Sequence, residues 1–245
     1  MWIKNDIFAR PMNIIKHLFI LLPLAVAPGI GICFFIYFRD KFEKEPFRLL
    51  VKCFFLGFLS IIPAIIIELL FEALGINGNQ GVFKTLVYAF LVVGVAEEGS
   101  KFFFLRIFAY KKDAFNEPFD GIVYAMMVSM GFATLENIEY VLINGLGTAL
   151  LRMFTAIPLH AVCAIFMGFY LGKAKFSVNK TRNILLGLFF AIAIHGLYDF
   201  FLFQKNIPAL SVFSFVTLGL AIGMSFIAIN RLQKNSPFRG KAGQS

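Results

Sequence analysis

Charged residues are scarce in this chain. They make up 15% of its 245 residues, whereas hydrophobic residues make up 59% and the mean hydropathy is +0.80. A soluble domain of this size needs more charge on its surface, so the composition excludes that class and is typical of a polytopic α-helical membrane protein. Charge is confined to short segments between apolar runs. We therefore expect one integral-membrane domain, residues 1–245.

Several motifs are absent as well. Cys33, Cys53 and Cys163 form no CxxC pair and lie in or beside apolar runs, so we expect neither a disulfide framework nor a Cys-based metal site. No HExxH sequence is present, which argues against a zincin-type site. The net charge of +9 comes without a nucleic-acid motif, and the positive-inside rule accounts for it. We therefore expect a lipid bilayer and no nucleic acid as partner.

Seven apolar runs are long enough to cross a bilayer as helices. The expected fold class is therefore all-α, a polytopic transmembrane bundle of about seven spans. Pro23 and Pro28 lie inside the first run and predict a kink or break there. The basic segment 231–245 is expected to be a disordered cytoplasmic tail. The runs cover about residues 14–38, 49–74, 82–109, 119–143, 151–171, 183–203 and 209–230.

The distribution of Lys and Arg between the loops predicts the orientation. Fifteen of them lie on one face, in segments 39–52, 111–112, 173–182 and 231–241, and six lie on the other. The positive-inside rule makes the first face cytoplasmic. We therefore expect a multi-pass protein of the cell membrane with its C-terminus in the cytoplasm and its N-terminus outside.

The third apolar run carries three charges near its middle, Glu97, Glu98 and Lys101. A charge at the bilayer centre costs roughly 2.5–3.5 kcal/mol on insertion scales, so intramembrane ionisable residues are functional-site candidates. The i,i+4 and i,i+3 spacings place Lys101 within reach of both carboxylates on a helix. The group predicts a buried acid–base site. The alternative is an ion pair that only orders the bundle.

Three other runs carry polar groups at overlapping depth. At about 1.5 Å per helical residue, Glu136 lies about 10 Å below the outer face, and His160 and His195 lie about 12 Å below it. Asp199 is one turn from His195, about 6 Å deep, and can accept a hydrogen bond from its imidazole. Glu97 lies about 20 Å deep. Four helices therefore predict a shared, water-accessible cavity that opens away from the cytoplasm.

Two further residues lie beside these groups. Asn137 follows Glu136 and is expected to support it, although the two could merely cap their helix. Arg152 is expected at the membrane interface, where it snorkels to the surface or pairs with Glu68 or Glu72.

Carboxylates and imidazoles in such a cavity suit hydrolysis. A glutamate is a suitable general base for activating water, and an imidazole N–H can stabilise an oxyanion. Peptide hydrolysis would then need no nucleophilic Ser or Cys. The same groups also suit a divalent metal, whose ligands would be Glu97, Glu136, His160 and His195.

Four segments resemble the motifs of PrsW-type intramembrane proteases. Glu97-Glu-Gly-Ser-Lys101 matches EExxK, and Phe132-Ala-Thr-Leu-Glu136-Asn matches FxxxEN. The Pro-Leu-His160-Ala segment that follows Arg152, and His195-Gly-Leu-Tyr-Asp199, match the other two. The motifs occur in order over roughly residues 94–200, within a core of about 82–203.

The resemblance implies a membrane endopeptidase that clips single-span proteins on their extracytoplasmic side, typically an anti-sigma factor. The family is related to CAAX-prenyl endoproteases and Abi-type proteins, thought to use a glutamate-activated water. By that analogy Glu97 is the base and no cofactor is needed. The implied catalytic residues are Glu97, Glu98, Glu136, His160, His195 and Asp199, supported by Lys101 and Asn137.

Three alternatives stay open. The first is the same protease with a divalent metal, because EExxK replaces the wider pattern EExxxR and Glu136 stands where FxxxH would place a His. The second is a proton-coupled transporter, although we find no inverted-repeat symmetry. The third is an inactive scaffold that binds partner helices.

Overall fold

The computed structural model describes residues 11–78, 81–204 and 207–240. Every regular element in these residues is helical, which confirms the all-α fold class. The elements include a π-helix, η1, and two short 3₁₀-helices, η2 and η3. In order they are α1 (Pro11–Arg39), α2 (Phe47–Ala73), α3 (Val82–Val87), η1 (Tyr88–Gly94), α4 (Val95–Ile107), η2 (Ala109–Lys111), α5 (Asp120–Asn144), α6 (Leu146–Phe154), α7 (Ala156–Lys175), α8 (Lys180–Leu202), η3 (Pro208–Ser211) and α9 (Val212–Lys234).

Six helical segments in the described part of the chain are long and apolar enough to cross a membrane. They are α1, α2, α5, α6 with α7, α8, and η3 with α9. The seventh predicted span is the uninterrupted segment α3–η1–α4, which carries Glu97, Glu98 and Lys101. Large exposed apolar side chains such as Phe19 and Phe83 suit a lipid-facing surface.

The first predicted run contains no break at Pro23 and Pro28, because α1 continues through both residues. The predicted tail is not irregular throughout, since residues 231–234 form the last turn of α9. Residues 241–245 of that tail lie outside the described part of the chain.

The predicted run 151–171 is divided into two helices. Helix α6 ends at Phe154 and α7 begins at Ala156, with Thr155 at φ −125° and ψ −78° between them. Pro158 lies in the first turn of α7, where a missing amide hydrogen removes no helical hydrogen bond. The division therefore lets α6 and α7 point in different directions.

Helices α5 and α7 form the centre of the bundle. Of the most apolar stretch of α5, 83% is buried inside the protein, against 22% for α2. Helix α5 packs against α1, α2, α4, α6 and α7. Its crossing with α2 is very close, because a Cβ on Gly131 would lie 1.9 Å from the carbonyl oxygen of Phe54. Small residues at such crossings allow helix backbones to approach each other in membranes.

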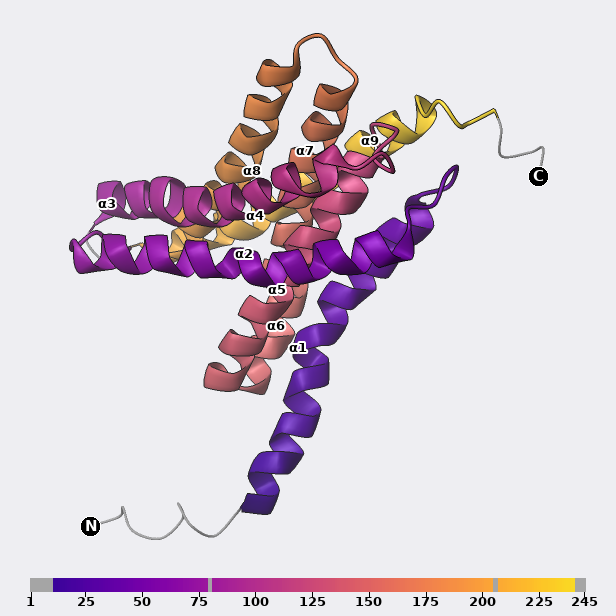
Figure 1. Ribbon diagram of the computed structural model, residues 1–245. Coiled ribbons are helices and arrows are strands. Elements are labelled where there is room, and N and C mark those ends of the chain that lie inside the picture. Colours follow the sequence, from indigo (N-terminus) through magenta and orange to yellow (C-terminus); the bar gives the residue numbers. More distant parts are fainter. Residues whose placement is uncertain (1–10, 79–80, 205–206, 241–245) are drawn as a thin grey trace, which may run out of the picture.

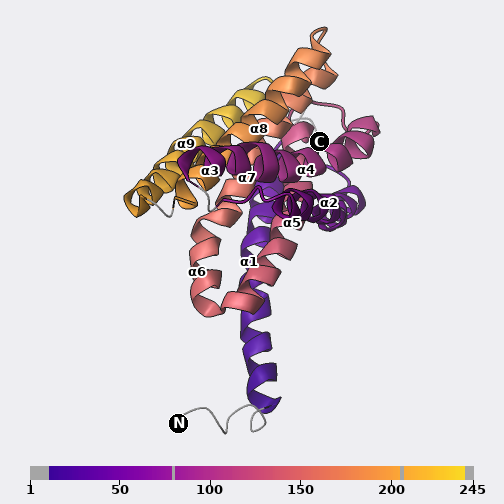
Figure 2. The ribbon, with the colours of Figure 1, turned by 90° about the vertical axis from the view of Figure 1, so that its left-hand side faces the viewer.

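The helices run in two main directions (Figures 1 and 2). Helix α2 and the segment α3–η1–α4 lie side by side and cross α5. The first half of α1 projects to one side of this crossing together with α6 and the end of α5, and the α7–α8 hairpin extends to the other. Helices α4, α5, α7 and α8 therefore approach one another in the middle of the protein.

Candidate active site

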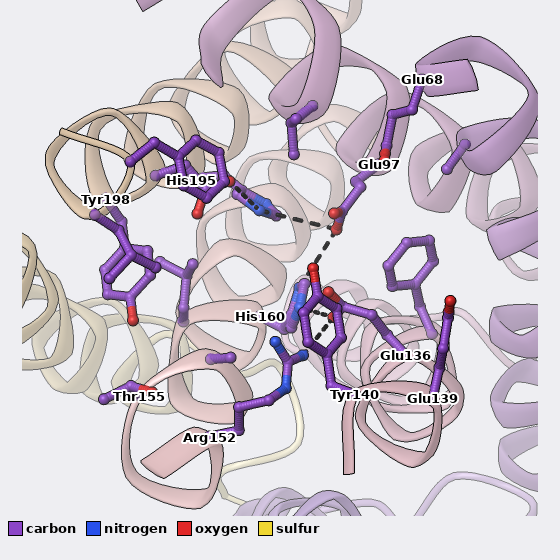
Figure 3. Close-up of a pocket in the computed structure, with 18 of the residues that line it drawn as sticks. Glu68, Glu97, Glu136, Glu139, Tyr140, Arg152, Thr155, His160, His195 and Tyr198 are labelled. Atoms are coloured by element: carbon purple, nitrogen blue, oxygen red, sulfur yellow. Dashed lines mark hydrogen bonds and ion pairs between the residues drawn. The ribbon is translucent and has the colours of Figure 1, made fainter. Parts of the chain in front are cut away.

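A cavity of about 720 Å³ lies where these helices meet (Figure 3). Its inner wall contains Glu97 from α4, His160 from α7 and His195 from α8. Its outer wall is formed by the last turns of α2, α5 and α8, and includes Glu72 and Tyr140. These helix ends lie at the opposite end of the bundle from the basic segments 39–52 and 173–182, so the cavity opens on the face with few Lys and Arg.

The centre of the site is a buried ion cluster on α4. Lys101 Nζ lies 3.0 Å from Glu97 Oε2 and 2.8 Å from Glu98 Oε1. Both spacings are those expected on one turn of a helix, so Lys101 does reach both carboxylates. The ammonium also lies 4.0 Å from the ring centre of Phe132, a cation–π contact. Phe132 is one helical turn from Glu136, and that spacing is the sequence signal that could have identified it.

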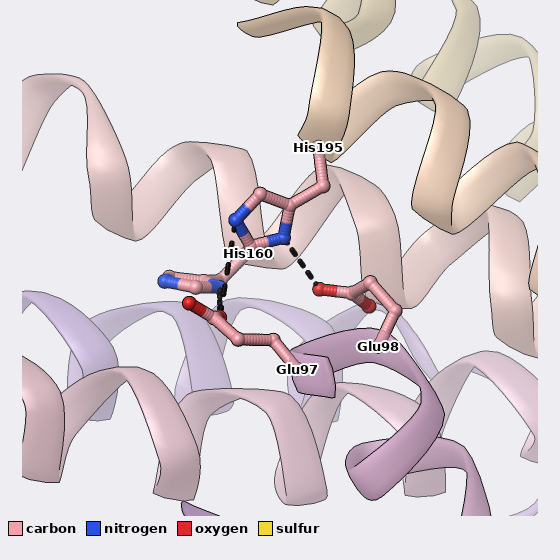
Figure 4. A group of neighbouring side chains, drawn as sticks. All are labelled: Glu97, Glu98, His160 and His195. Atoms are coloured by element: carbon pink, nitrogen blue, oxygen red, sulfur yellow. Dashed lines mark hydrogen bonds and ion pairs between the residues drawn. The ribbon is translucent and has the colours of Figure 1, made fainter. Parts of the chain in front are cut away.

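His195 links this cluster to α8 (Figure 4). Its Nδ1 lies 2.8 Å from Glu98 Oε1, and its Nε2 lies 3.8 Å from Glu97 Oε2. Nε2 is also 3.3 Å from Asp199 Oδ2, one turn further along α8. The imidazole is therefore surrounded by three carboxylates, two of which are within hydrogen-bonding distance.

His160 links the cluster to α5. Its Nδ1 is 3.0 Å from Lys101 Nζ, and its Nε2 is 2.8 Å from Glu136 Oε2. An ammonium group only donates, so Nδ1 accepts and Nε2 carries the proton that is donated to Glu136. This pair of contacts fixes one tautomer of the neutral imidazole. The rings of His160 and His195 pack edge to face with centres 5.3 Å apart.

Arg152 lies in this network, so its predicted pairing with Glu68 or Glu72 is wrong. Its guanidinium is 2.8 Å from Glu136 Oε2, and its Nε donates to Asn137 Oδ1 at 2.9 Å. The guanidinium also stacks 4.1 Å from the ring centre of Tyr140. Depth estimates along single helices could not reveal these contacts, because α6 folds back beside α5 and brings Arg152 inward.

A close contact between η1 and α8 sets the distance between Glu98 and His195. A Cβ on Gly196 would lie 2.7 Å from the ring of Phe90, so only glycine permits this packing. On the facing segment, a Cβ on Gly94 would lie 3.3 Å from the carbonyl oxygen of Ile192. π-Helical turns such as η1 are frequent at functional sites. Here the π-helix directly precedes the glutamate pair.

Four donor residues in the described part of the chain could share one metal ion. They are Glu97, Glu98, His160 and His195, whose donor atoms lie within 4.8 Å of one another. The metal alternative named Glu136 in place of Glu98, but Glu136 contacts the far nitrogen of His160. These donors suit a divalent ion by type. They do not fit one as arranged, since Lys101 Nζ already lies within 3.0 Å of three of them.

The two glutamates differ in access to the cavity. Glu97 lines it and is 6% exposed, whereas Glu98 is 0% exposed and does not line it. A water molecule in the cavity could therefore contact Glu97 directly. The arrangement offers one accessible carboxylate, an imidazole beside it, and buried partners that hold both in place.

Comparison with known proteins identifies the family of the chain. Residues 45–228 match the family described as PrsW family intramembrane metalloprotease. The chain is 41% identical over 190 residues to Protease PrsW of Geobacillus kaustophilus, covering 77% of this chain and 82% of that protein. It is 37% identical over 187 residues to Protease PrsW of Bacillus subtilis, covering 76% and 84%, respectively.

A third relative extends the match along the chain. Protease PrsW of Halalkalibacterium halodurans is 32% identical over 219 residues, which cover 88% of this chain and 97% of that protein. No solved structure matches the chain. These relatives are peptidases, so the comparison favours hydrolysis over proton-coupled transport. The chain belongs to the PrsW family and is a membrane-embedded peptidase.

Proposed function

We propose that this protein hydrolyses peptide bonds of single-span membrane proteins near their extracytoplasmic side, with a water molecule activated by Glu97. The observation that carries this proposal is the difference between the two adjacent glutamates. Glu97 lines the cavity, whereas Glu98 is enclosed by Lys101 and His195. A general base must reach the water from which it takes a proton. Glu98 then acts as the support of the base.

In this proposal each group has a step in hydrolysis. Glu97 takes a proton from water while the water oxygen bonds to the carbonyl carbon. The Nε2–H of His195, which is 3.8 Å from Glu97 Oε2, donates to the oxyanion that forms. Glu97 then returns the proton to the leaving amine as the C–N bond breaks. Asp199 and Glu98 hold the imidazole of His195 between them.

The second histidine has a positioning role in this proposal. Glu136 and Lys101 fix the tautomer of His160 through opposite ring nitrogens. Arg152 in turn pairs with Glu136, and Asn137 accepts a hydrogen bond from Arg152. Glu136 therefore contributes a charge to the wall of the cavity, and Arg152 and His160 pair with that charge.

The position of the cavity supports cleavage on the extracytoplasmic side. It opens on the face with few Lys and Arg, and the positive-inside rule assigns that face to the outside, with the C-terminus in the cytoplasm. Exposed apolar residues, Leu69, Ile143 and Leu151, border the opening. A membrane segment of a substrate could therefore approach from the lipid. A single-span protein of the anti-sigma-factor type is the substrate class we propose.

The test is cleavage of a single-span substrate by the purified full-length protein in proteoliposomes. The substrate carries a different epitope tag at each end, and mass spectrometry of the fragments locates the cleaved bond. We expect the wild type to cut near the extracytoplasmic end of the span. Glu97→Gln should lower the rate at least about 100-fold, the lower end of the range for a general base.

Asp113→Asn is the matched control, because Asp113 is an exposed carboxylate on a loop at the opposite end of the bundle. It should cleave at the wild-type rate. Normal cleavage by Glu97→Gln would contradict the assignment of the base. An inactive scaffold predicts that the wild type does not cleave either.

A further inference from the structure

The Lys101 ammonium lies at the centre of the donor set of the site. Its distances to Glu97 Oε2, Glu98 Oε1 and His160 Nδ1 are 3.0, 2.8 and 3.0 Å. These three atoms surround the nitrogen, and the ring of Phe132 lies close by on α5. The Lys101 side chain is 2% exposed. It is therefore enclosed and directed at the donors.

The atoms that bind Lys101 are those that a metal ion would need. Carboxylate oxygens and an imidazole nitrogen bind Zn²⁺ or Co²⁺ at about 2.0–2.2 Å, inside the volume that the ammonium fills. His160 also has the tautomer that a metal requires, since Nδ1 offers its lone pair and Nε2 donates to Glu136. Lys101 thus takes the coordination position of a metal within an otherwise suitable ligand set.

The charge of the cluster leads to the same conclusion. Among the described residues, Lys101 is the one Lys or Arg within 4.0 Å of Glu97 or Glu98. Both carboxylates are buried, and a buried carboxylate is strongly unfavourable unless a cation compensates it. A divalent ion added beside Lys101 would place two cations in contact. The Lys101 ammonium and a divalent ion therefore cannot both occupy the donor set.

We propose that Lys101 is the resident cation of this centre and excludes a divalent metal, and that loss of its ammonium converts Glu97, Glu98, His160 and His195 into a metal site. The native centre then holds no metal, although the family description includes one. The inference concerns the same residues as the proposed function. It does not depend on the hydrolytic steps described there.

The experiment measures metal binding by the full-length protein in detergent, with Co²⁺ as the probe. The readouts are metal content after dialysis, the visible absorption of bound Co²⁺, and the change in Tm on adding Co²⁺ or EDTA. We expect the wild type and Lys101→Arg to bind no stoichiometric Co²⁺ and to show no change in Tm. Lys101→Met should bind one Co²⁺ per chain at least about tenfold more tightly than the wild type, or ~1.4 kcal/mol.

Two further variants make the result specific. Lys101→Met combined with His160→Ala should lose the Co²⁺ absorption, because one of the ligands is removed. Lys180→Met is the matched control, since Lys180 is exposed at the start of α8 and far from the cluster. It should behave as the wild type.

Stoichiometric Co²⁺ in the wild type, lost in His160→Ala or His195→Ala, would overturn the inference, even if Lys101→Met does not fold. A folded Lys101→Met protein that binds no Co²⁺ would overturn the proposal that loss of the ammonium creates a metal site. Either result leaves the proposed function open, because cleavage is measured separately. Conversely, a metal-free wild type that cleaves no substrate would contradict the proposed function and not this inference.

Discussion

At the scale of single residues, three glutamates of the site are each paired with a cation. Lys101 compensates the two adjacent glutamates, and Arg152 compensates Glu136. Such pairs offset the cost of removing charges from water, but they leave an uncompensated charge when one partner is lost. Single and double substitutions should therefore have different effects.

Arg152→Met should destabilise the protein through Glu136. Loss of a fully buried partner costs roughly 3–5 kcal/mol, and the partial exposure of this pair lowers our expectation to about 1–3 kcal/mol. Thermal unfolding in detergent measures the change. Arg152→Met with Glu136→Gln should recover part of the loss, because the unpaired charge is gone.

The control for this change is Arg182→Met, at an exposed position in the first turn of α8. It should leave the unfolding free energy within about 0.5 kcal/mol of the wild type, as is usual for surface substitutions. An Arg152→Met protein as stable as this control would mean that the Arg152–Glu136 contact contributes nothing to stability.

Contacts within a helix could be predicted at this scale, and contacts between helices could not. The spacing of Glu97, Glu98 and Lys101 on one turn was sufficient to predict both ion pairs. The contact of Glu98 with His195 joins residues 97 positions apart, and it depends on the rotation of α8 against α4. Only the folded arrangement fixes that rotation.

At the scale of helices, glycines determine how closely the spans approach. The α2–α5 crossing has no space for a side chain at Gly131, and the η1–α8 contact has none at Gly196. The sequence contains 20 Gly, and pattern alone does not distinguish those at crossings from those facing lipid. The sequence was sufficient to predict most of the spans. It was not sufficient to predict how the spans pack, because that depends on which glycines lie at the crossings.

Gly131→Ala should force α2 and α5 apart. The added Cβ would lie 1.9 Å from the carbonyl oxygen of Phe54, a backbone atom that cannot rotate away. Overpacking of this kind costs typically ~1–3 kcal/mol. We expect a lower Tm and a lower cleavage rate, because Phe132 and Glu136 on α5 would move with the helix.

Gly223→Ala on α9 provides the comparison for that change. A Cβ at Gly223 would meet nothing within 4 Å, and alanine favours the helix by roughly 0.8–1.0 kcal/mol over glycine. This variant should be at least as stable as the wild type. Equal Tm values for the two variants would show that the α2–α5 crossing tolerates a wider separation.

At the scale of the whole molecule, a second group of buried acids lies at the end of the bundle that carries the basic segments 39–52 and 173–182. Asp40 and Glu45, from the α1–α2 loop, and Glu117 and Asp120, at the start of α5, are each at most 3% exposed. Burial and the charge of Asp120 raise the pKa of Asp40 to about 7 and that of Glu45 to about 10. Burial also raises the pKa of Glu117.

These raised pKa values predict lower stability at alkaline pH. Asp40 and Glu45 bind protons more tightly in the folded chain than in the unfolded chain, where carboxyl pKa values are about 4. The free energy of unfolding should therefore fall as the pH rises from about 5 to about 8. The groups that face Asp40 are Asp120, Lys44 and Glu117, and Glu43 also faces Glu45.

Thermal unfolding from about pH 5 to pH 8 tests this expectation. Asp40→Asn should flatten the decline, since the amide remains neutral throughout. Asp113→Asn, on an exposed loop position, should keep the wild-type slope. A wild-type Tm that does not change with pH would mean that these carboxyls do not hold protons in the folded protein.

The origin of the site residues has a consequence for biosynthesis. Its groups come from α4, α5, α7 and α8, so the reactive centre does not exist in a partly synthesised chain. His195 is among the last contributors to be made, and it must reach Glu98 after the earlier spans have entered the bilayer. On the proposed mechanism, the nascent polypeptide gains peptidase activity only after α8 has packed against α4.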